Sequence, residues 1–515
     1  MGSAEALGWR SQVQGFFQPC LATGAPAECG LGEAMLTDVK ELLADFLARG
    51  LLSDLLSIGG FVLALFLVAR LMSQKKAPGN TFAWLLIIVL LPYVGVPLFL
   101  MFGGRKLRRL AARKSNLIPK LPSPPGTPSI FATWPVAHTI MSSGAGSPVA
   151  GNRLQLLTTG EETFAVLERH ILAARHTIHI NTFILGRDDT GRRIVQLLAE
   201  RARAGIKVRL LLDAVGCMFV GRSFYAALKQ AGGEVVIFMP VLPFTSRGSA
   251  NLRNHRKIAV FDGASAIIGG HNLAHEYMGP TPFKKRWRDL GALIEGPAAT
   301  LLNEVFVADW CFASRQSPAI VNRGTHLAAP DRGEAELQVV ASGPDVPGDP
   351  LYEGIISMIQ EAERSVWIVT PYFIPDDVLL RSLIVKARAG RQVTLIVPER
   401  SNHPVTDFAR RHYVRELQRA GARVLLFRPG MMHSKAVIVD DCIGLLGSAN
   451  FDLRSLFVNF EIGVVVHTQN DVLEMKAWAE ALVTHCHEPK GEPRKRYRFL
   501  VTALEDFSRL LAPLL

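Results

Sequence analysis

Histidine and lysine recur at matched positions in two stretches of the chain, HRKIAVFDGASAIIGGHN at residues 255–272 and HSKAVIVDDCIGLLGSAN at residues 433–450. Each stretch has a His, a Lys two positions later and an Asp five positions after that, followed by a small pair and an Asn at the same offset. An imidazole can attack phosphorus or transfer a proton near neutral pH, and an ammonium attracts phosphate oxygens. The doubled pattern therefore predicts chemistry on a phosphate group.

The two motifs supply the candidate catalytic residues, which are His255, Lys257, Asp262, His433, Lys435 and Asp440. In each copy the His and the Lys are separated by one residue on a predicted strand, so the two side chains should point to the same face. The two Asp residues directly follow that strand, where a carboxylate is well placed to fix the turn. The small residues near the end of each motif let the backbone approach a phosphate. The candidate phosphate-binding residues are Asn272, Asn450 and Ser448.

Two histidines can take different roles: one can be a neutral nucleophile and the other a protonated acid, as a double displacement requires. Each imidazole then needs an acceptor that orients it. Asp289 in WRD and Glu461 in NFE lie 34 and 28 residues after the histidines and are the candidates. Whether each carboxylate serves the histidine of its own half or of the other half stays open.

No metal site or cofactor is expected. His271 and His275 are four residues apart, as zinc ligands can be, but no further ligands cluster with them. We therefore interpret both as ordinary polar residues of the fold.

The elements that must position the motifs form an internal duplication. From about residue 151 strands alternate with amphipathic helices, which is typical of an α/β fold, and the same order of elements occurs twice. The offset between the copies is 185 residues at the two ARAG sequences and 178 residues at the two motif histidines. We therefore expect two similar α/β domains, at 151–330 and 331–515, that pack about a pseudo-twofold axis and build one active site between them.

Two apolar runs precede the duplicated part, at residues 51–72 and 82–102. Each is long enough to cross a hydrocarbon core of about 30 Å, and the turn residues in SQKKAPGNT join them. We expect a transmembrane helical hairpin within residues 51–104. The basic run at 103–114, GGRKLRRLAARK, places the region after the hairpin in the cytoplasm by the positive-inside rule and suits anionic lipid headgroups.

The remaining N-terminal segments are less distinctive. Residues 1–50 contain the start of an amphipathic helix, at residues 35–57, which is either interfacial or packed on protein. Residues 105–150 are basic at first and then rich in Pro, Gly and Ser, which is typical of a linker.

The composition narrows the classes of partner. The chain has 515 residues, 49% of them hydrophobic, and a formal net charge of +12, which favours an anionic partner such as nucleic acid or an anionic membrane surface. Six cysteines in a chain of this length do not form a disulfide framework, although Cys20 and Cys29 are close enough in sequence to pair.

The motifs resemble those of the phospholipase D superfamily and, more narrowly, of the bacterial cardiolipin synthases. The resemblance covers roughly residues 50 to 515 and includes the expected hairpin and the basic run that follows it. The stretches that carry it are NLRNHRK (251–257), GGHNLAHEY (269–277), WRD (287–289), SGPD (342–345), TPYFIPD (370–376) and GSANFDLRSLFVNFE (447–461).

This resemblance implies a metal-independent transfer of a phosphatidyl group between two phosphatidylglycerol molecules at the surface of the bacterial inner membrane. It implies that His255 is the nucleophile, that His433 exchanges protons with the departing glycerol and the incoming hydroxyl, and that the lysines and asparagines hold the phosphate. Arg253 and Arg454 are candidates, by charge alone, for a second phosphate. The expected partners are phosphatidylglycerol and other anionic lipids, and self-association stays open.

Other functions remain compatible with the motif. The same site could hydrolyse lipids to phosphatidic acid or use phosphatidylethanolamine, because the motif fixes phosphodiester chemistry and not the acceptor. A nuclease would fit the net charge, but two membrane spans argue against it, and no nucleic acid partner is expected. A scaffold without catalysis is disfavoured because both motifs are intact.

Overall fold

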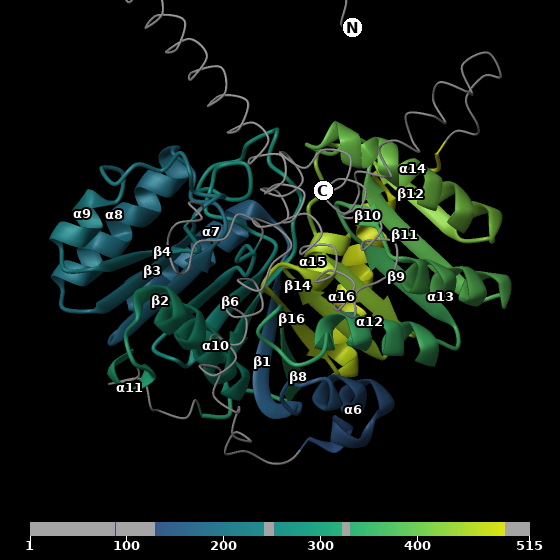
Figure 1. Ribbon diagram of the computed structural model, residues 1–515, viewed down its shortest axis with the longest axis horizontal. Coiled ribbons are helices and arrows are strands. Elements are labelled where there is room, and N and C mark those ends of the chain that lie inside the picture. Colours follow the sequence, from purple (N-terminus) through teal and green to yellow (C-terminus); the bar gives the residue numbers. More distant parts are fainter. Residues whose placement is uncertain (1–87, 89–128, 241–251, 322–329, 490–515) are drawn as a thin grey trace, which may run out of the picture. The chain divides into compact units, whose positions relative to one another are not determined.

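The structure is a computed structural model that describes residues 88, 129–240, 252–321 and 330–489 (Figure 1). The transmembrane hairpin expected within 51–104, the amphipathic helix at 35–57 and the pair Cys20 and Cys29 therefore lie outside the described residues. Within the ranges that are described, no helix combines the length and the apolar character needed to cross a membrane. Cys217, Cys311, Cys442 and Cys486 are free thiols, as expected.

The first half of the duplicated part contains the predicted alternation of strands and helices. In chain order its elements are β1 (Val149–Leu157), α7 (Gly160–Ala173), β2 (Thr177–Thr182), α8 (Asp189–Arg203), β3 (Lys207–Asp213), α9 (Ala226–Gln230), β4 (Glu234–Phe238), β5 (Ile258–Phe261), β6 (Ser265–Gly269), β7 (Gly291–Glu295), α10 (Pro297–Ser314) and α11 (Pro318–Val321).

The second half repeats this order and adds three short strands, two of which pair with each other, and one short helix. Its elements are β8 (Ala335–Ser342), α12 (Pro350–Glu361), β9 (Ser365–Val369), β10 (Phe373–Ile374), α13 (Asp377–Arg388), β11 (Gln392–Pro398), α14 (Pro404–Arg419), β12 (Arg423–Phe427), β13 (Ala436–Val439), β14 (Ile443–Gly447), β15 (Phe451–Asp452), α15 (Leu453–Phe457), β16 (Glu461–Val466), α16 (Gln469–Val483) and β17 (Cys486–His487).

The strands of both halves join in one sheet of 15 strands, and the two halves are arranged in mirror order along it. From the middle outward the first half runs β1, β7, β6, β5, β2, β3, β4 and the second runs β8, β16, β14, β13, β9, β11, β12, with β17 at the outer edge. Strands β1 and β8 pair antiparallel at the middle, so the two halves are related by a twofold operation there. The predicted α/β class and its duplication are confirmed.

The local signals that begin and end the equivalent helices are also repeated. Asp188 caps α8 by accepting a hydrogen bond from the N–H of Gly191, and Asp376 caps α13 in the same way. Both helices end at an ARAG sequence whose Gly, Gly205 or Gly390, has a positive φ, a backbone conformation that glycine adopts without strain. The two halves therefore share turn chemistry as well as strand order.

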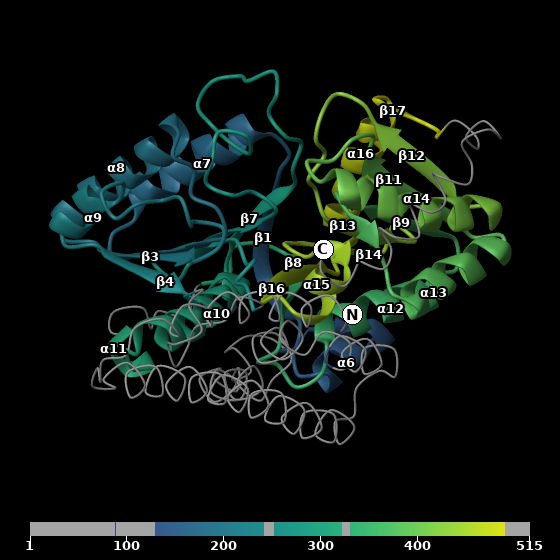
Figure 2. The same cartoon turned by 45° about the horizontal axis from the view of Figure 1, so that its top comes forward.

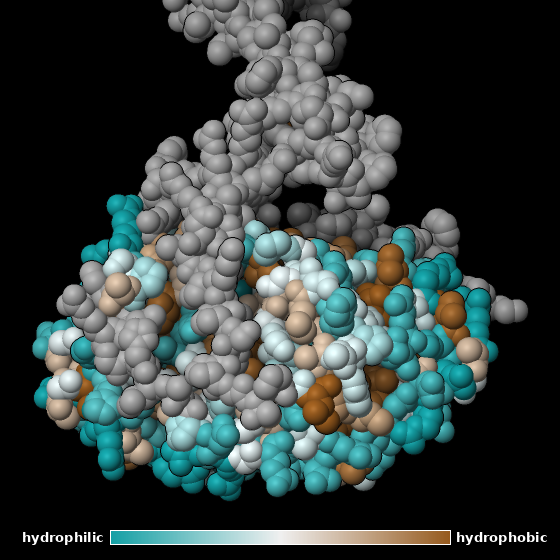
Figure 3. Space-filling view, turned by 90° about the horizontal axis from the view of Figure 1, so that it is seen from below, coloured by the Kyte–Doolittle hydropathy of each residue, from teal (hydrophilic) through white to brown (hydrophobic). Residues whose placement is uncertain are grey.

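Helices cover both faces of the sheet. In the first half α7 and α8 pack on one face and α10 on the other, as Figure 2 shows. The core beneath α10 continues without a break into the core beneath α16 of the second half. The halves consequently share a hydrophobic core as well as a sheet. On the face drawn in Figure 3 the described surface is mainly hydrophilic, with small separate hydrophobic patches.

The linker expected over residues 105–150 is wrong at its C-terminal end. Ile130–Thr133 forms a 3-10 helix, Pro135–Ser142 forms α6, and β1 already begins at Val149. Buried Val136 and Ile140 place α6 against the core under α12. Pro and Ser residues are typical of linkers, but in this segment Pro135 begins α6 and Ser142 ends it. The helix forms because it has an apolar face to bury.

Asn152 on β1 ties the central strand pair to α10. Its side-chain amide donates to the carbonyls of Val149 at 2.8 Å and Ala335 at 3.2 Å, and its Oδ1 accepts from the N–H of Ala298 at 2.7 Å. The side chain is completely buried, so water could not take its place as the hydrogen-bond partner of these backbone groups.

We expect Asn152→Ala to lower the free energy of unfolding by about 2 to 3 kcal/mol, because it leaves buried backbone donors and acceptors unpaired at the junction of the halves. Thermal unfolding of the full chain in detergent measures the loss. The control is Arg153→Ala, whose side chain is 69% exposed and should change stability by less than about 0.5 kcal/mol. Equal stability of the two variants would contradict the role of Asn152.

Candidate active site

The two motif histidines lie where the halves meet, and backbone hydrogen bonds between the halves hold them there. The N–H of His255 donates to the carbonyl of Phe460 at 2.9 Å, and the N–H of His433 donates to the carbonyl of Arg288 at 2.6 Å. The residue before each histidine forms an isolated parallel bridge with the residue before the candidate carboxylate of the other half. Each half therefore positions the histidine of the other.

The same arrangement decides which carboxylate orients which histidine. Nδ1 of His255 lies 2.9 Å from Oε1 of Glu461, and Nδ1 of His433 lies 2.7 Å from Oδ2 of Asp289. Because a carboxylate only accepts, Nδ1 of each ring is the donor towards its carboxylate. Nε2 of His255 is then the nitrogen available to a reacting atom, whereas Nε2 of His433 lies 3.1 Å from Nζ of Lys435. The pairs are crossed: each histidine is oriented by the other half, which resolves the alternative that the sequence leaves open.

Both motif lysines accompany their histidines, but not on a strand. Strands β5 and β13 begin at Ile258 and Ala436, one residue after each lysine, so the predicted start of the strands is wrong. The reason is that the backbone next to the histidines is hydrogen-bonded to the opposite half instead of to a neighbouring strand. Nζ of Lys257 donates to the carbonyl of His255 at 2.7 Å. Nζ of Lys435 donates to the carbonyl of His433 and lies 2.7 Å from Nδ1 of that ring.

Burial lowers the pKa of both lysines. The pKa of Lys257 falls to about 7 and that of Lys435 to about 8, and repulsion between the two ammonium groups contributes to the value for Lys257. Glu461 opposes the shift at both lysines, and Asp289 does so as well. Charges from one half thus act on groups of the other half, as expected of a single shared site.

Burial and the lysines also lower the pKa of both imidazoles. Burial lowers the pKa of His255, and the nearby charge of Glu461 only partly offsets this. The pKa of His433 falls well below its ordinary value because the ring is buried and lies near Lys435 and Lys257. Both rings are therefore neutral near pH 7 before an anion binds. The expected split into a neutral and a protonated histidine is not present in the unliganded site.

The two carboxylates differ in how firmly they hold their charge. Although burial raises the pKa of Glu461, the neighbouring His255 and Lys257 and a hydrogen bond from Ser448 bring it below the ordinary value. Burial raises the pKa of Asp289, and Lys435 offsets only part of that increase. Glu461 is thus the more strongly anionic partner.

Aromatic side chains enclose both imidazoles. The ring of Phe183 meets that of His255 edge-on at 5.0 Å, and Tyr277 and Trp287 lie 5.1 and 5.3 Å from His433. The side chain of His255 is 12% exposed and that of His433 only 5%. His255 is the more accessible of the two.

The candidate phosphate-binding residues surround the same histidines with different partners. Oδ1 of Asn272 accepts from the N–H of Ile184 at 3.1 Å, whereas Oδ1 of buried Asn450 has no hydrogen-bond partner in the described part of the chain. Ser448 donates its hydroxyl to Glu461 and so orients a carboxylate. Gly270 occupies the equivalent place in the first half, where a Cβ would lie 2.1 Å from a carboxylate oxygen of Asp289.

The two motif aspartates lie away from the histidines. Asp262 accepts hydrogen bonds of 2.7 and 2.8 Å from three successive backbone N–H groups at the start of β2, and Asp440 accepts bonds of 2.6 and 2.8 Å from three at the start of β9. Both residues have a positive φ, which Asp tolerates better than most residues do. Their geometry fixes the turn and offers no contact with the reacting atoms, so their place among the catalytic residues is a correction to the sequence analysis.

Arg256, inside the first motif, is a structural residue that sequence reasoning missed. It is 1% exposed and donates to Asp309 at 2.7 Å, to the carbonyl of Glu461 at 2.9 Å and to the carbonyl of Ser342 at 3.1 Å. It therefore joins α10 of the first half to two strands of the second. The signal in the sequence was the difference between Arg256 and its counterpart Ser434 at the variable position of the motif.

The two arginines named as candidates for a second phosphate lie close together near the site. Arg253 is buried, donates to the carbonyl of Met239 at 2.9 Å and contacts Asp213 at 3.5 Å. Asp213 also raises the pKa of Arg454, which burial lowers. The side chain of Arg253 thus has a structural role in addition to its charge.

The two further histidines considered as metal ligands do not come together. Nε2 of His271 lies 3.4 Å from the hydroxyl of Thr163, whereas Nδ1 of His275 lies 3.1 Å from Asp188. Asp188, His275 and Glu276 lie close enough to share an ion, but all three are only half-buried, His275 contacts both carboxylates, and Asp188 also caps α8.

Comparison with known proteins decides the family. A family profile described as "Cardiolipin synthase, PLD-like domain" matches residues 167–310 and 355–483, and one described as "Phospholipase_D-nuclease N-terminal" matches residues 61–104. The chain is 33% identical over 468 residues to cardiolipin synthase 1 of Bacillus cereus, an alignment that covers 86% of this chain and 90% of the relative. The chain belongs to the cardiolipin synthase family.

Two further comparisons agree with this family assignment. Cardiolipin synthase A of Pseudomonas aeruginosa is 33% identical over 478 residues, which cover 90% of this chain and 96% of that one. Among solved structures, the phosphatidylserine synthase of Haemophilus influenzae superposes with a TM-score of 0.56 at 16% identity, covering 74% of this chain and all of that one. That likeness supports the fold of this cardiolipin synthase family member.

The lysine pKa values predict how anion binding depends on pH. A lysine with a pKa of about 7 is charged below that pH and neutral above it, so affinity for a phosphodiester anion should fall as pH rises from 7 to 9, first as Lys257 and then as Lys435 loses its proton. Titration with a non-hydrolysable phosphonate lipid measures this. Lys257→Arg, which stays charged throughout, should remove the first part of the decline. A constant affinity up to pH 9 would contradict the lowered values.

Proposed function

We propose that this chain is a membrane-bound cardiolipin synthase that transfers a phosphatidyl group from one phosphatidylglycerol to another and releases glycerol. The observation that carries the proposal is the pair of crossed histidine–carboxylate contacts, each with a lysine beside it, inside a chain of the cardiolipin synthase family. This arrangement offers two imidazoles to one phosphate, as a two-step displacement needs.

In the first step Nε2 of His255 attacks the phosphorus of phosphatidylglycerol. A P–N bond forms as the P–O bond to the terminal glycerol breaks, and the departing alkoxide takes a proton from His433. Lys257 and Lys435 hold the non-bridging oxygens, whose charge is greatest in the transition state. The bound anion also raises the pKa of His433 towards the protonated form, which the unliganded site does not favour.

In the second step the proton moves in the opposite direction. His433, now neutral, takes a proton from the hydroxyl of a second phosphatidylglycerol, and that oxygen attacks the phosphorus as the P–N bond breaks. The products are cardiolipin and regenerated His255. The acceptor is a lipid alcohol instead of water, which is the distinction between a synthase and a phospholipase that forms phosphatidic acid.

Two differences between the halves support the assignment of His255 as nucleophile. Its ring is the more exposed of the two, and its partner Glu461 is held anionic by His255, by Lys257 and by a hydrogen bond from Ser448 that Gly270 cannot supply to Asp289. An anionic partner stabilises the imidazolium character that develops on His255 during attack. The lowered pKa of His433 works against its role as the acid, so the negative charge of the bound substrate must raise that pKa.

The membrane placement belongs to the same proposal. The N-terminal profile at residues 61–104 supports a hairpin that anchors the enzyme in the inner membrane with the duplicated part on the cytoplasmic side. Anchoring holds the site beside a surface rich in lipid hydroxyls, which favours a lipid over water as the acceptor.

Purified full-length protein in detergent micelles, given labelled phosphatidylglycerol and a chelator, should form cardiolipin and free glycerol. His255→Ala and His433→Ala should each lower the rate by at least about 1,000-fold, since each removes one half of the acid–base pair. Phosphatidic acid as the only lipid product would reject the synthase in favour of a phospholipase. Cleavage of DNA without lipid turnover would reject both.

A phosphatidyl adduct should accumulate on His255. Rapid quenching in alkaline denaturant, followed by peptide mass spectrometry, preserves the acid-labile P–N bond and locates it. The peptide containing His255 should carry the label in the unmodified enzyme and lose it in His255→Ala. Label on the peptide containing His433 would reverse the roles of the two residues.

A further inference from the structure

Exposed apolar side chains gather on the loop between β3 and α9 in the first half. The side chain of Phe219 is 76% exposed and that of Met218 is 60% exposed, and Val215 nearby is exposed as well. Of the large hydrophobic residues that the structure describes, Phe219 has the greatest exposed fraction. A group of apolar side chains in water is unfavourable unless a partner covers it. This loop is therefore a candidate contact surface.

The loop is held in one shape by the residues at its base. Oδ1 of Asp213 accepts hydrogen bonds of 2.8 and 3.2 Å from two N–H groups of the loop. Cys217 is buried in the core, and its thiol donates to the carbonyl of Phe183 at 3.3 Å. A Cβ on Gly216 would lie 2.0 Å from the same carbonyl oxygen, so the loop packs directly on Phe183. The exposure of the loop tip is therefore a fixed property of the fold.

The base of this loop also lies beside the first motif histidine. The ring of Phe183, on which the loop packs, meets the ring of His255 edge-on at 5.0 Å. Asp213 accepts from the N–H of Asn254, the residue before His255, at 3.0 Å. A single aromatic side chain thus separates the loop from the imidazole.

A second loop of the first half exposes another aromatic ring. Residues 279–287, GPTPFKKRW, lie between β6 and β7, and Phe283 among them is exposed. Arg286 fixes this loop by donating to Glu161 at 2.5 Å and to two carbonyls of the loop at 3.2 and 2.9 Å. The loop ends at Trp287, whose ring lies 5.3 Å from that of His433. Each motif histidine therefore has an exposed apolar loop behind an aromatic residue that covers it.

The two loops lie at the same edge of the sheet. Strands β2, β3 and β6 run in one direction, so their carboxyl ends share that edge. Arg187, after β2, donates to the carbonyl of Phe219 at 3.3 Å. The next residue, Asp188, lies 3.1 Å from His275, and the ring of His275 lies 5.2 Å from that of Phe283. Contacts therefore lead without a break from Phe219 to Phe283.

The charges of the two loops suit an anionic surface. Neither loop contains Asp or Glu, and together they expose three basic side chains, Arg222, Lys284 and Lys285. The carboxylates on the connecting segments already have partners. Asp188 and Glu276 contact His275, and Asp189 pairs with Arg192 at 2.7 Å. The loops therefore place positive charge beside their exposed apolar side chains.

We propose that Met218, Phe219 and Phe283, which we name the apolar rim, insert into the interface of an anionic bilayer. Aromatic and thioether side chains suit the boundary between headgroups and acyl chains, and basic side chains beside them attract anionic headgroups. The rim sets the histidine site on the surface where a lipid substrate lies. This deepens the proposed function and rests on it, because the membrane supplies the phosphatidylglycerol of that reaction.

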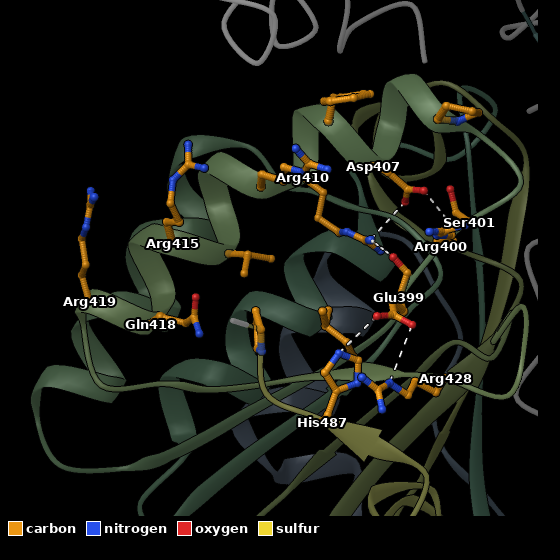
Figure 4. A pocket seen from close by; sticks show the side chains of 16 residues that line it. Glu399, Arg400, Ser401, Asp407, Arg410, Arg415, Gln418, Arg419, Arg428 and His487 are labelled. Carbon is orange, nitrogen blue, oxygen red and sulfur yellow. Dashed lines mark hydrogen bonds and ion pairs between the residues drawn. The ribbon is translucent and has the colours of Figure 1, made fainter. Parts of the chain in front are cut away.

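The groove along α14 in the second half, drawn in Figure 4, does not offer a comparable surface. Its large apolar lining residues are buried or half-buried, and they are Phe408, Val414 and Leu426. Glu399 contacts His487 at 3.3 Å, and Asp407 contacts Arg410 at 3.1 Å. Acyl chains would meet little exposed hydrophobic surface there, which favours the rim of the first half.

Photocrosslinking of the full-length protein in vesicles tests the proposal. The photoreactive residue p-benzoylphenylalanine takes the place of Phe219 or of Phe283, and the vesicles contain phosphatidylcholine and phosphatidylglycerol in equal amounts. Either probe should form adducts with lipid acyl chains, which peptide mass spectrometry detects. The control carries the probe in place of Val385, an exposed residue of α13, and should form no lipid adduct.

A double variant tests whether the two loops enter the bilayer together. With the probe in place of Phe283, Met218→Ser with Phe219→Ser should lower the yield of lipid adduct about 10-fold, because two apolar side chains no longer contribute to insertion. The matched variant, Val378→Ser with Val385→Ser, removes two exposed apolar side chains from α13 and should leave the yield unchanged. Both double variants should melt at the temperature of the unmodified protein.

The lipid composition tests the charge. In vesicles of phosphatidylcholine alone the yield should fall at least about 5-fold, because the basic side chains lose their anionic headgroups. Equal yields with and without phosphatidylglycerol would overturn the proposal, as would an unchanged yield in the rim variant. Adducts with protein instead of lipid would also overturn it, because the rim would then contact a second copy or another part of the chain.

Cardiolipin formation in the same vesicles separates this inference from the proposed function. Lipid adducts at either probe in a protein that makes no cardiolipin would leave the rim standing and reject the synthase. Cardiolipin formation without lipid adducts at either probe would do the opposite.

Discussion

The crossed contacts between the halves are the feature on which the rest of the site depends. A backbone bridge before each histidine aligns it with the segment before the carboxylate of the other half, so His255 meets Glu461 and His433 meets Asp289. Neither half can form a complete histidine–carboxylate pair alone. The continuous sheet, the shared core under α10 and α16, and the buried Arg256 all maintain this one alignment.

Burial of these groups explains their electrostatics. Removing the lysines from water lowers the pKa of Lys257 to about 7 and that of Lys435 to about 8. Burial, together with the nearby lysine charges, likewise lowers the pKa of both imidazoles and favours their neutral form. A site in this state is prepared to receive an anion, because a phosphodiester restores the charge that burial disfavours. The bound substrate therefore favours protonation of His433, which supplies the proton that the leaving group needs.

Duplication provides two copies, but small differences between them give the copies different properties. Ser448 orients Glu461, whereas Gly270 leaves room for Asp289, and Arg256 forms buried contacts that Ser434 at the matching position is too short to form. A further difference is the length of one equivalent helix, since α14 has 16 residues and α9, at the same place in the first half, has five. An enzyme descended from a symmetric pair can in this way separate the role of nucleophile from that of acid.

The doubled motif was sufficient to predict the α/β class, the duplication, the family and the histidines, lysines and carboxylates that meet, because residue spacing along a strand and the repeat of the whole pattern are visible in one dimension. The turn role of Asp262 and Asp440 could likewise be read from their place directly after the strand. The motif could not predict that the carboxylates are exchanged between the halves or that α6 replaces part of a linker. These features depend on which distant segments pack together, and burial and hydrogen-bond partners exist only after they have done so.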